Sequence, residues 1–207
     1  MNPTTRLVTD PERPHRRVIR EAARRLRRGE IALIPTDTVY GLAVHPDAPN
    51  ALESLARVKA RDPGKPIAFL VDSAQQVTER YEALPGPRGR ALMEAYWPGP
   101  LTLVMPVGDR DEGFRMPGHA VTLALLTACG GALRVTSANR SGEPEARCVD
   151  EALKALPEGV GFALDTGPVG VLEPSTVVRV GAHGYEILRE GSICAEDIGN
   201  VIRIAKS

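Results

Sequence analysis

The segment IALIPTDTVYGLAV, which spans residues 31–44, decides the fold class because it joins a buried strand to a polar loop. Its first residues are continuously apolar, which is typical of a short strand buried on both faces. Pro35 ends this strand, and the polar residues after it lead to Gly41, where the backbone can approach a ligand closely. Ligands of open α/β sheets bind where strands end in such loops, so the segment points to a site as well as a fold.

Helix and strand patterns alternate on both sides of this segment. Apolar residues recur at helical spacing over residues 15–28, with Val18, Ile19 and Leu26 on one face. Further helices are expected over residues 50–58, 73–96 with a break at 85–87, 120–129 and 150–156; strands are expected over residues 66–71, 101–107, 133–136, 161–165, 175–180 and 185–189. Residues 108–118 are expected to form a loop. The alternation predicts an α/β protein with a single-domain, twisted, open mixed sheet flanked by helices.

The domain is expected to cover residues 15–207. Residues 1–14 contain Pro3, Pro11 and Pro14 without periodicity, so they are expected to form an extended lead-in. A length of 207 residues fits one domain with a sizeable core, and 43% hydrophobic and 25% charged residues are ordinary proportions for a globular protein.

Charge and cysteine usage exclude several classes of protein. The chain has 26 Lys and Arg against 26 Asp and Glu, which argues against a polybasic protein. Its cysteines form no C-x-x-C pair, so neither a disulfide framework nor a zinc knuckle is indicated. No apolar run of membrane-spanning length and no signal peptide are present. We therefore expect a soluble protein in the reducing cytoplasm.

The helix expected over residues 15–28 is rich in arginine on its polar face. Eight arginines lie between Arg13 and Arg28. Such a face can contact phosphates of RNA, but a solvated helix surface explains it equally well, and a charge run alone specifies no partner.

Polar side chains follow several strands. They are Thr36, Asp37, Thr38 and Tyr40 after the first strand, Ser137 and Asn139 after the strand at 133–136, and Ser175 and Thr176 at the start of another. Each one alone is a common turn residue. Together they predict one pocket at the strand ends.

A compact cationic loop stands out in a chain that has only four lysines. Lys59, Arg61 and Lys65 lie within seven residues around a Pro-Gly pair. A guanidinium donates in a planar fork and an ammonium acts as a point charge, so this combination suits polyphosphate oxygens. The familiar nucleotide motifs, a P-loop and G-x-G-x-x-G, are absent, as are an esterase elbow and paired zinc-binding histidines.

Seven blocks taken in order resemble the YrdC/TsaC family. They are IPTDTVYGL (34–42), KARDPGKP (59–66), WPGPLTLV (97–104), GFRMP (113–117), TSANRSGEP (136–144), PSTVV (174–178) and ILREG (187–191). Members of this family are L-threonylcarbamoyladenylate synthases. The resemblance implies the short form, with a YrdC-like twisted sheet around a large concave cationic cavity.

The resemblance also implies substrates and residue roles. ATP, L-threonine and bicarbonate would give threonylcarbamoyl-AMP and pyrophosphate, for modification by partner proteins of the tRNA adenosine next to the anticodon. Mg²⁺ would be held mainly by ATP phosphates and water, with no protein metal site. By resemblance, Lys59 and Arg61 are the catalytic residues. The implied ATP contacts are Arg61, Lys65, Ser137, Asn139 and Arg189, and the implied threonine contacts are Thr36, Thr38, Tyr40, Arg115 and Ser175.

Two other hypotheses stay open from the sequence. One is a non-catalytic relative that binds double-stranded RNA or tRNA through the concavity and the region from Arg13 to Arg28. The other is an enzyme of the same fold that acts on another amino acid or carbamoyl acceptor.

Overall fold

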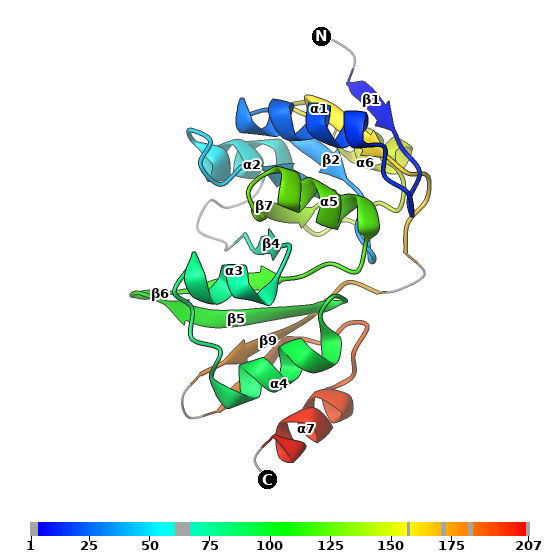
Figure 1. The fold of residues 1–207 in the computed structure, drawn as a ribbon. Coiled ribbons are helices and arrows are strands. Elements are labelled where there is room, and N and C mark those ends of the chain that lie inside the picture. Colours follow the sequence, from blue (N-terminus) through cyan, green and yellow to red (C-terminus); the bar gives the residue numbers. More distant parts are fainter. Residues whose placement is uncertain (1–3, 61–66, 157, 171–172, 182–183, 206–207) are drawn as a thin grey trace.

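Helices and strands alternate along the chain in the computed structural model, which describes residues 4–60, 67–156, 158–170, 173–181 and 184–205 (Figure 1). The strands are β1 (Thr5–Val8), β2 (Ala32–Ile34), β3 (Gly41–Val44), β4 (Phe69–Val71), β5 (Leu101–Val107), β6 (Arg110–Arg115), β7 (Ala132–Ser137), β8 (Phe162–Asp165), β9 (Thr176–Val180) and β10 (Tyr185–Arg189). The helices are α1 (Arg16–Arg27), α2 (Ala51–Lys59), α3 (Ala74–Glu79), α4 (Gly86–Tyr96), α5 (Ala120–Ala128), α6 (Val149–Ala155) and α7 (Ala195–Ile204).

These strands form one mixed sheet in the order β1-β8-β2-β3-β7-β4-β6-β5-β9-β10. β1 and β2 pair with β8 in parallel, as β4 does with β6 and β5 with β9. The other neighbours pair antiparallel. The predicted α/β class with a mixed sheet flanked by helices is therefore confirmed.

Three apolar clusters join the helices to the sheet. The first packs α1 and α5 on β2, β7 and β8; the second packs α2 and α6 on β2, β3 and β8; the third packs α4 and α7 on β5 and β9. Helix α1 buries Ile19, Ala22, Ala23 and Leu26, the face expected from its spacing. Figure 1 shows α1, α2, α5 and α6 around one half of the sheet and α3, α4 and α7 around the other.

Several elements differ from the sequence-based expectation. Residues 1–14 are not only a lead-in, because Thr5–Val8 form the edge strand β1, whose register with β8 pairs Thr5 with Phe162. Residues 108–118 are not a loop throughout, because Arg110–Arg115 form β6 in a hairpin with β5. Strand β3 and helix α7 had no counterpart in the expected elements. One face of β6 lines a cavity and is therefore polar, so the strand lacks the alternating apolar residues that predict a strand from sequence.

The position of that cavity follows from the two-residue repeat of strands. Leu103 of β5 and Phe114 of β6 are paired and lie in the third apolar cluster, so their neighbours Thr102 and Arg115 point to the other side of the sheet. Arg115 pairs with Leu70 of β4, and Leu70 pairs with Leu133 of β7, which packs under α5. Helices α1 and α5 therefore cover one half of this face, and the other half is left for the cavity.

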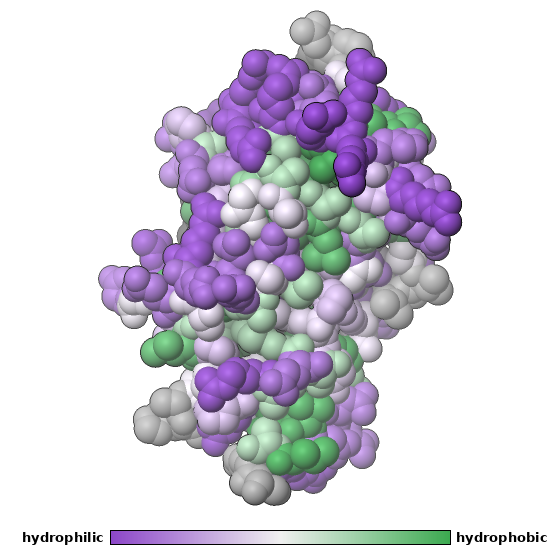
Figure 2. All heavy atoms as spheres, viewed as in Figure 1, coloured by the Kyte–Doolittle hydropathy of each residue, from purple (hydrophilic) through white to green (hydrophobic). Residues whose placement is uncertain are grey.

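The surface reflects this arrangement. Hydrophilic side chains cover α1, and a more apolar band lies over α5 next to it (Figure 2). Among the residues that the structure describes, no helix is both long and apolar enough to cross a bilayer.

The cysteines differ in their environment, which gives a test of the packing. Cys129 is buried in the first cluster, and burial raises the pKa of its thiol to about 11, whereas Cys194 is exposed. Since the thiolate is the reactive form, we expect Cys194 and not Cys129 to react rapidly with a thiol reagent at pH 8. Peptide mapping after brief alkylation measures this, and Cys129→Ser is expected to leave the fast phase unchanged. Rapid labelling of Cys129 in the folded protein would contradict the packing described here.

Candidate functional site

A cavity of about 400 Å³ lies on the open face of the sheet. The loop before β3, the strands β5, β6, β7 and β9, and the segment before β9 all contribute to its wall. Its polar lining residues are Thr36, Thr38, Tyr40, Thr102, Asp111, Arg115, Thr136, Ser137, Glu145, Ser175, Arg179 and Arg189; apolar residues such as Ile67, Val104, Val177 and Leu188 complete the wall. The strand ends therefore meet at one site, as the sequence predicts.

Arg115 forms the polar centre of one end of this cavity. Its Nε donates to the Gly99 carbonyl at 3.0 Å and its Nη1 to the Thr38 hydroxyl at 3.0 Å. Its Nη2 donates to Oδ1 of Asp37 at 2.6 Å, forming a buried ion pair. Burial lowers the pKa of Arg115 and the Asp37 carboxylate opposes that effect. The guanidinium is thus fixed at the end of β6 with its charge partly balanced.

The loop after β2 holds its two threonines by local hydrogen bonds. The Thr36 hydroxyl donates to the Val39 carbonyl at 2.6 Å and accepts from the amides of Thr38 and Val39 at 3.2 Å. The Thr38 hydroxyl lies 3.1 Å from that of Thr36. This turn buries both hydroxyls and places Thr38 against Arg115.

Ser175 belongs to a second polar group in the lining of the same cavity. Nη2 of Arg189 donates to the Ser175 carbonyl at 2.8 Å, and the Ser175 hydroxyl lies 2.9 Å from that of Thr102. The register of β5 with β6 and β9, and of β9 with β10, puts Arg115, Thr102, Val177 and Arg189 in one row across the sheet. Predicted threonine-side and ATP-side residues therefore lie on one surface.

Lys59, Ser137 and Asn139 form a third group, behind the wall. The Lys59 ammonium donates to Oδ1 of Asn139 at 3.0 Å and to the Ser137 carbonyl at 2.5 Å. The Ser137 hydroxyl donates to the same Asn139 oxygen at 2.6 Å. Lys59 and Asn139 are buried, and only Ser137 of the three lines the cavity. In this arrangement Lys59 connects the end of α2 to the end of β7.

Ile67, where the described chain resumes, is held by β7. Arg134 of β7 donates to the Ile67 carbonyl at 2.6 Å, pairs with Glu112, and stacks over the ring of Phe69 at 3.5 Å. Arg61 and Lys65, which the sequence assigns to the phosphates, lie outside the described residues, so the predicted cationic character of the cavity remains a prediction.

Tyr40 lines the cavity but its hydroxyl points elsewhere. That hydroxyl donates to the Gly167 carbonyl at 2.8 Å, and the ring packs in the second apolar cluster. Burial raises the pKa of Tyr40. Its geometry favours a role in shaping the wall, while its predicted threonine contact stays untested.

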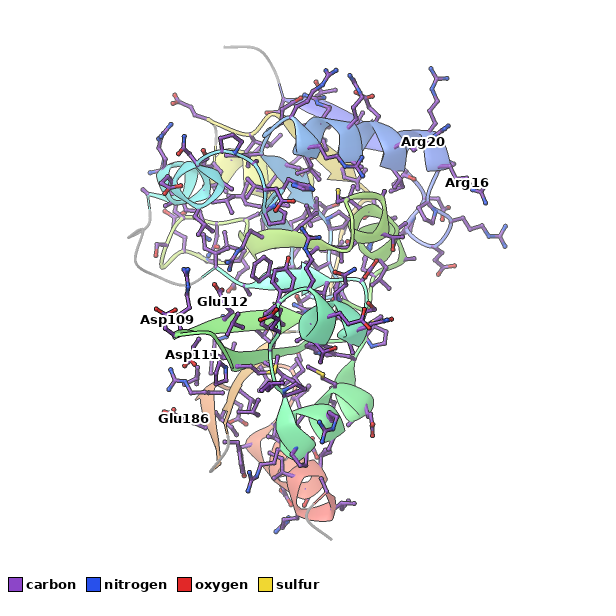
Figure 3. All side chains as sticks on the ribbon, turned by 60° about the vertical axis from the view of Figure 1, so that its left-hand side comes forward. Arg16, Arg20, Asp109, Asp111, Glu112 and Glu186 are labelled. Carbon is purple, nitrogen blue, oxygen red and sulfur yellow. The ribbon has the colours of Figure 1, made fainter. Side chains whose placement is uncertain are left out.

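Charged side chains stand at the rim on the side of β6, β9 and β10. Arg179 pairs with Asp111 at 3.1 Å and with Glu186 at 2.7 Å. Figure 3 shows Asp109, Asp111 and Glu112 on the β5–β6 hairpin and Glu186 near it on β10. The described wall therefore carries acidic as well as basic groups.

Sequence reasoning placed Asp37 among the polar residues after the first strand but gave it no partner, and it assigned no role to Thr102 or Arg179. Thr102 is the lone hydroxyl in an apolar strand, and a buried hydroxyl needs a hydrogen-bond partner. Its position in the sequence could therefore have indicated a polar contact at this strand. The ion pairs of Asp37 and Arg179 join positions that are far apart in the chain, and no local pattern encodes them.

The described part of the chain contains no group of three or more His, Cys, Asp and Glu side chains that could hold a metal ion. Of the two carboxylates that line the cavity, Asp111 is paired with Arg179.

Two glycines hold the site loops close to neighbouring backbone. Gly170 has a φ of +68°, and a Cβ there would overlap the Thr38 carbonyl oxygen. A Cβ on Gly191 would overlap the backbone of Pro174 and Ser175. The absence of a side chain at these positions lets both polar walls of the cavity pack against other loops.

Comparisons with known proteins show the family to which the chain belongs. The family model Sua5/YciO/YrdC, described as "Telomere recombination", matches residues 24–191. Threonylcarbamoyl-AMP synthase from Alkalilimnicola ehrlichii is 33% identical over 82% of this chain and 94% of its own. Threonylcarbamoyl-AMP synthase from Bacillus subtilis is 31% identical over 94% of this chain, which spans 59% of that relative.

A solved structure gives the same result for the fold. The crystal structure of P. abyssi Sua5 complexed with L-threonine superposes with a TM-score of 0.89 at 28% identity, over 96% of this chain and 61% of the other. The chain thus spans about three fifths of two of these proteins and nearly the full length of the third.

Substitution of Gly170 tests how closely the loops determine the site. Gly170→Ala adds a Cβ at a positive φ and against Thr38, so we expect a loss of about 1 to 3 kcal/mol in the free energy of unfolding. Chemical denaturation measures that loss. Gly167→Ala is the matched control, because Gly167 also has a positive φ but its Cβ would meet nothing within 4 Å. Equal losses for the two variants would show that contact with Thr38 contributes nothing.

Proposed function

Because the chain belongs to the Sua5/YciO/YrdC family, we propose that it is an L-threonylcarbamoyladenylate synthase, which forms threonylcarbamoyl-AMP and pyrophosphate from L-threonine, bicarbonate and ATP. The observation that carries the proposal is the group formed by Arg115 and Thr38, which lines the same cavity as Ser175. A guanidinium beside hydroxyls suits an amino acid that carries a carboxylate and a hydroxyl of its own. Thr36 and Tyr40 complete the proposed threonine side.

The reaction needs orientation and charge neutralisation more than a protein nucleophile. The threonine amine joins bicarbonate to give a carbamate and water. A carbamate oxygen then forms a bond to the α-phosphorus of ATP while the bond from that phosphorus to the β-phosphate oxygen breaks, and pyrophosphate leaves. A cavity that holds the carboxylate of threonine on fixed donors brings the reactants together before this step.

The nucleotide is proposed to bind toward Ser137 and Arg189. Arg61 and Lys65 supply charge for the phosphates, and Lys59 and Asn139 hold Ser137 in place through the hydrogen bonds described above. Mg²⁺ would be held mainly by the substrate's phosphates and water, and it would supply charge neutralisation for the leaving pyrophosphate. Partner proteins then transfer the threonylcarbamoyl group to the tRNA adenosine next to the anticodon, in the cytoplasm.

A second candidate function, binding of an RNA backbone, is favoured by one feature of α1. Arg16, Arg17 and Arg20 are exposed, and among the described residues no carboxylate lies within ion-pair distance of them. Figure 3 shows Arg16 and Arg20 projecting away from the helix. Arginines in the first turn oppose the helix dipole, and like charges four residues apart repel, so this pattern costs helix stability. Phosphates bound along this face would offset that cost.

Product detection is the direct test of the synthase. We expect the purified protein to form threonylcarbamoyl-AMP and pyrophosphate when ATP, L-threonine and bicarbonate are all present, as measured by mass spectrometry. L-Serine is the competing substrate, and a preference for serine would indicate an enzyme for another amino acid. The absence of any aminoacyl-carbamoyl adenylate would overturn the proposal.

Arg61 gives a sharper test of the nucleotide side. Arg61→Ala is expected to lower pyrophosphate release by at least about 100-fold, because it removes a donor to charge that develops on the phosphates. Arg57→Ala is the matched control, since Arg57 is an exposed arginine of α2 four residues earlier. Full activity of the Arg61 variant, with unfolding unchanged, would exclude the phosphate role of Arg61.

The RNA surface is tested with charge-matched variants. Changing Arg16, Arg17 and Arg20 together to Gln is expected to weaken binding of a tRNA and to lower its dependence on salt, because fewer counterions are released. The control changes three other exposed arginines, Arg57, Arg90 and Arg203, to Gln. Filter binding at several salt concentrations measures the affinity for tRNA and its dependence on salt. Equal losses of affinity in the two triple variants would show that net charge, and not α1, determines binding.

A further inference from the structure

We propose that Asp37 is a positioning residue for substrate carboxylate binding, acting through Arg115. This inference rests on the proposed function, because it assigns the carboxylate of L-threonine to Arg115. Asp37 itself is not among the residues that line the cavity. It therefore acts from behind the wall, on the guanidinium that the substrate meets.

The hydrogen bonds of Arg115 show how this positioning works. A guanidinium has five N–H donors. Three of them serve the Gly99 carbonyl, the Thr38 hydroxyl and the Asp37 carboxylate. These three acceptors lie on different sides of the group, so they fix both its plane and its rotation. One donor on each of the two terminal nitrogens is left for a carboxylate in the cavity.

Burial makes Asp37 the most important of the three partners. The side chains of Arg115 and Asp37 are only 9% and 12% exposed, so water cannot replace a lost partner. Burial disfavours the charged form of Arg115, and Asp37 is the carboxylate paired with it. Removing one partner of such a pair leaves the other charge buried and poorly balanced. The guanidinium would then turn toward other acceptors and lose its alignment with the substrate.

The surroundings of Asp37 keep its own carboxylate in place. A Cβ added to Gly118 would lie 3.5 Å from Oδ2 of Asp37, so the loop before α5 packs closely against this group. His119 follows in that loop, and its Nδ1 is buried without a partner among the described residues. Burial lowers the pKa of His119 while the Asp37 charge raises it. The loop before α5 thus packs against Asp37 behind Arg115, and Asp37 is the anion that offsets the guanidinium charge.

The test separates substrate positioning from general stability. Asp37→Ala is expected to raise the KM for L-threonine, and to weaken threonine binding measured by calorimetry without ATP, by about 10- to 100-fold. The KM for ATP is expected to change less than about threefold, because the nucleotide side has other contacts. Asp37→Asn keeps an oxygen that accepts from Arg115 but removes the charge that balances it, so it is expected to recover only part of the threonine affinity.

The control is Asp47→Ala. Asp47 pairs with Arg80 at 3.2 Å, outside the cavity, and its loss is expected to leave both KM values unchanged. Unchanged threonine affinity of Asp37→Ala, or equal losses for threonine and ATP, would overturn the proposal. Asp37→Asn as defective as Asp37→Ala would also overturn it, since the acceptor would then be irrelevant.

The outcomes distinguish this proposal from the proposed function. If the wild-type protein binds threonine but makes no threonylcarbamoyl-AMP, the proposed synthase activity is refuted. The calorimetric measurement of threonine binding then decides the role of Asp37. A wild-type protein that makes the product while Asp37→Ala keeps its threonine affinity refutes only the role of Asp37. A wild-type protein that does not bind threonine refutes both.

Discussion

The two-sided nature of the strands is the constraint on which this structure depends. In β5, β6 and β9 alternate residues pack into the apolar cluster beneath α4 and α7, so the residues between them face the other side of the sheet. In this half of the fold no helix of the described residues covers that side, and it holds the cavity. A polar residue such as Thr102 or Arg115 therefore follows from the same repeat that buries Leu103 and Phe114. The alternation of residues along these strands therefore produces the apolar core on one face of the sheet and the cavity on the other.

The polar groups of the cavity wall satisfy one another before any ligand binds. Thr36 and Thr38 are held by a turn, Ser175 by Thr102 and Arg189, and Ser137 by Lys59 and Asn139. Such networks are costly to leave incomplete in a dry interior, so they define a single arrangement of the wall. A ligand that enters then meets donors and hydroxyls whose positions are already set, which lowers the entropic cost of binding.

Local patterns in the sequence predicted much of the fold and part of the site. The spacing of Ile19 and Leu26 predicted α1, and the apolar runs predicted most strands, because both signals depend only on neighbouring residues. β6 was missed because its cavity-facing residues are polar. β1 was missed because it is short and has no clear strand pattern of its own; it is held in the sheet by pairing with β8, which is distant in sequence. The resemblance named Arg115, but its ion pair with Asp37 became evident only from the folded structure.

Strand β10 gives the two halves of the cavity unequal local stability. It lies at the edge of the sheet, pairs only with β9, and leaves most of its side chains exposed, whereas β6 lies inside the sheet between β4 and β5. Edge segments with few buried contacts open at a lower free energy than central strands. Brief fraying of β10 would release Arg189 from Ser175 while Arg115 kept its partners. For the proposed nucleotide site this means that local opening on the Arg189 side would leave the rest of the cavity in its shape.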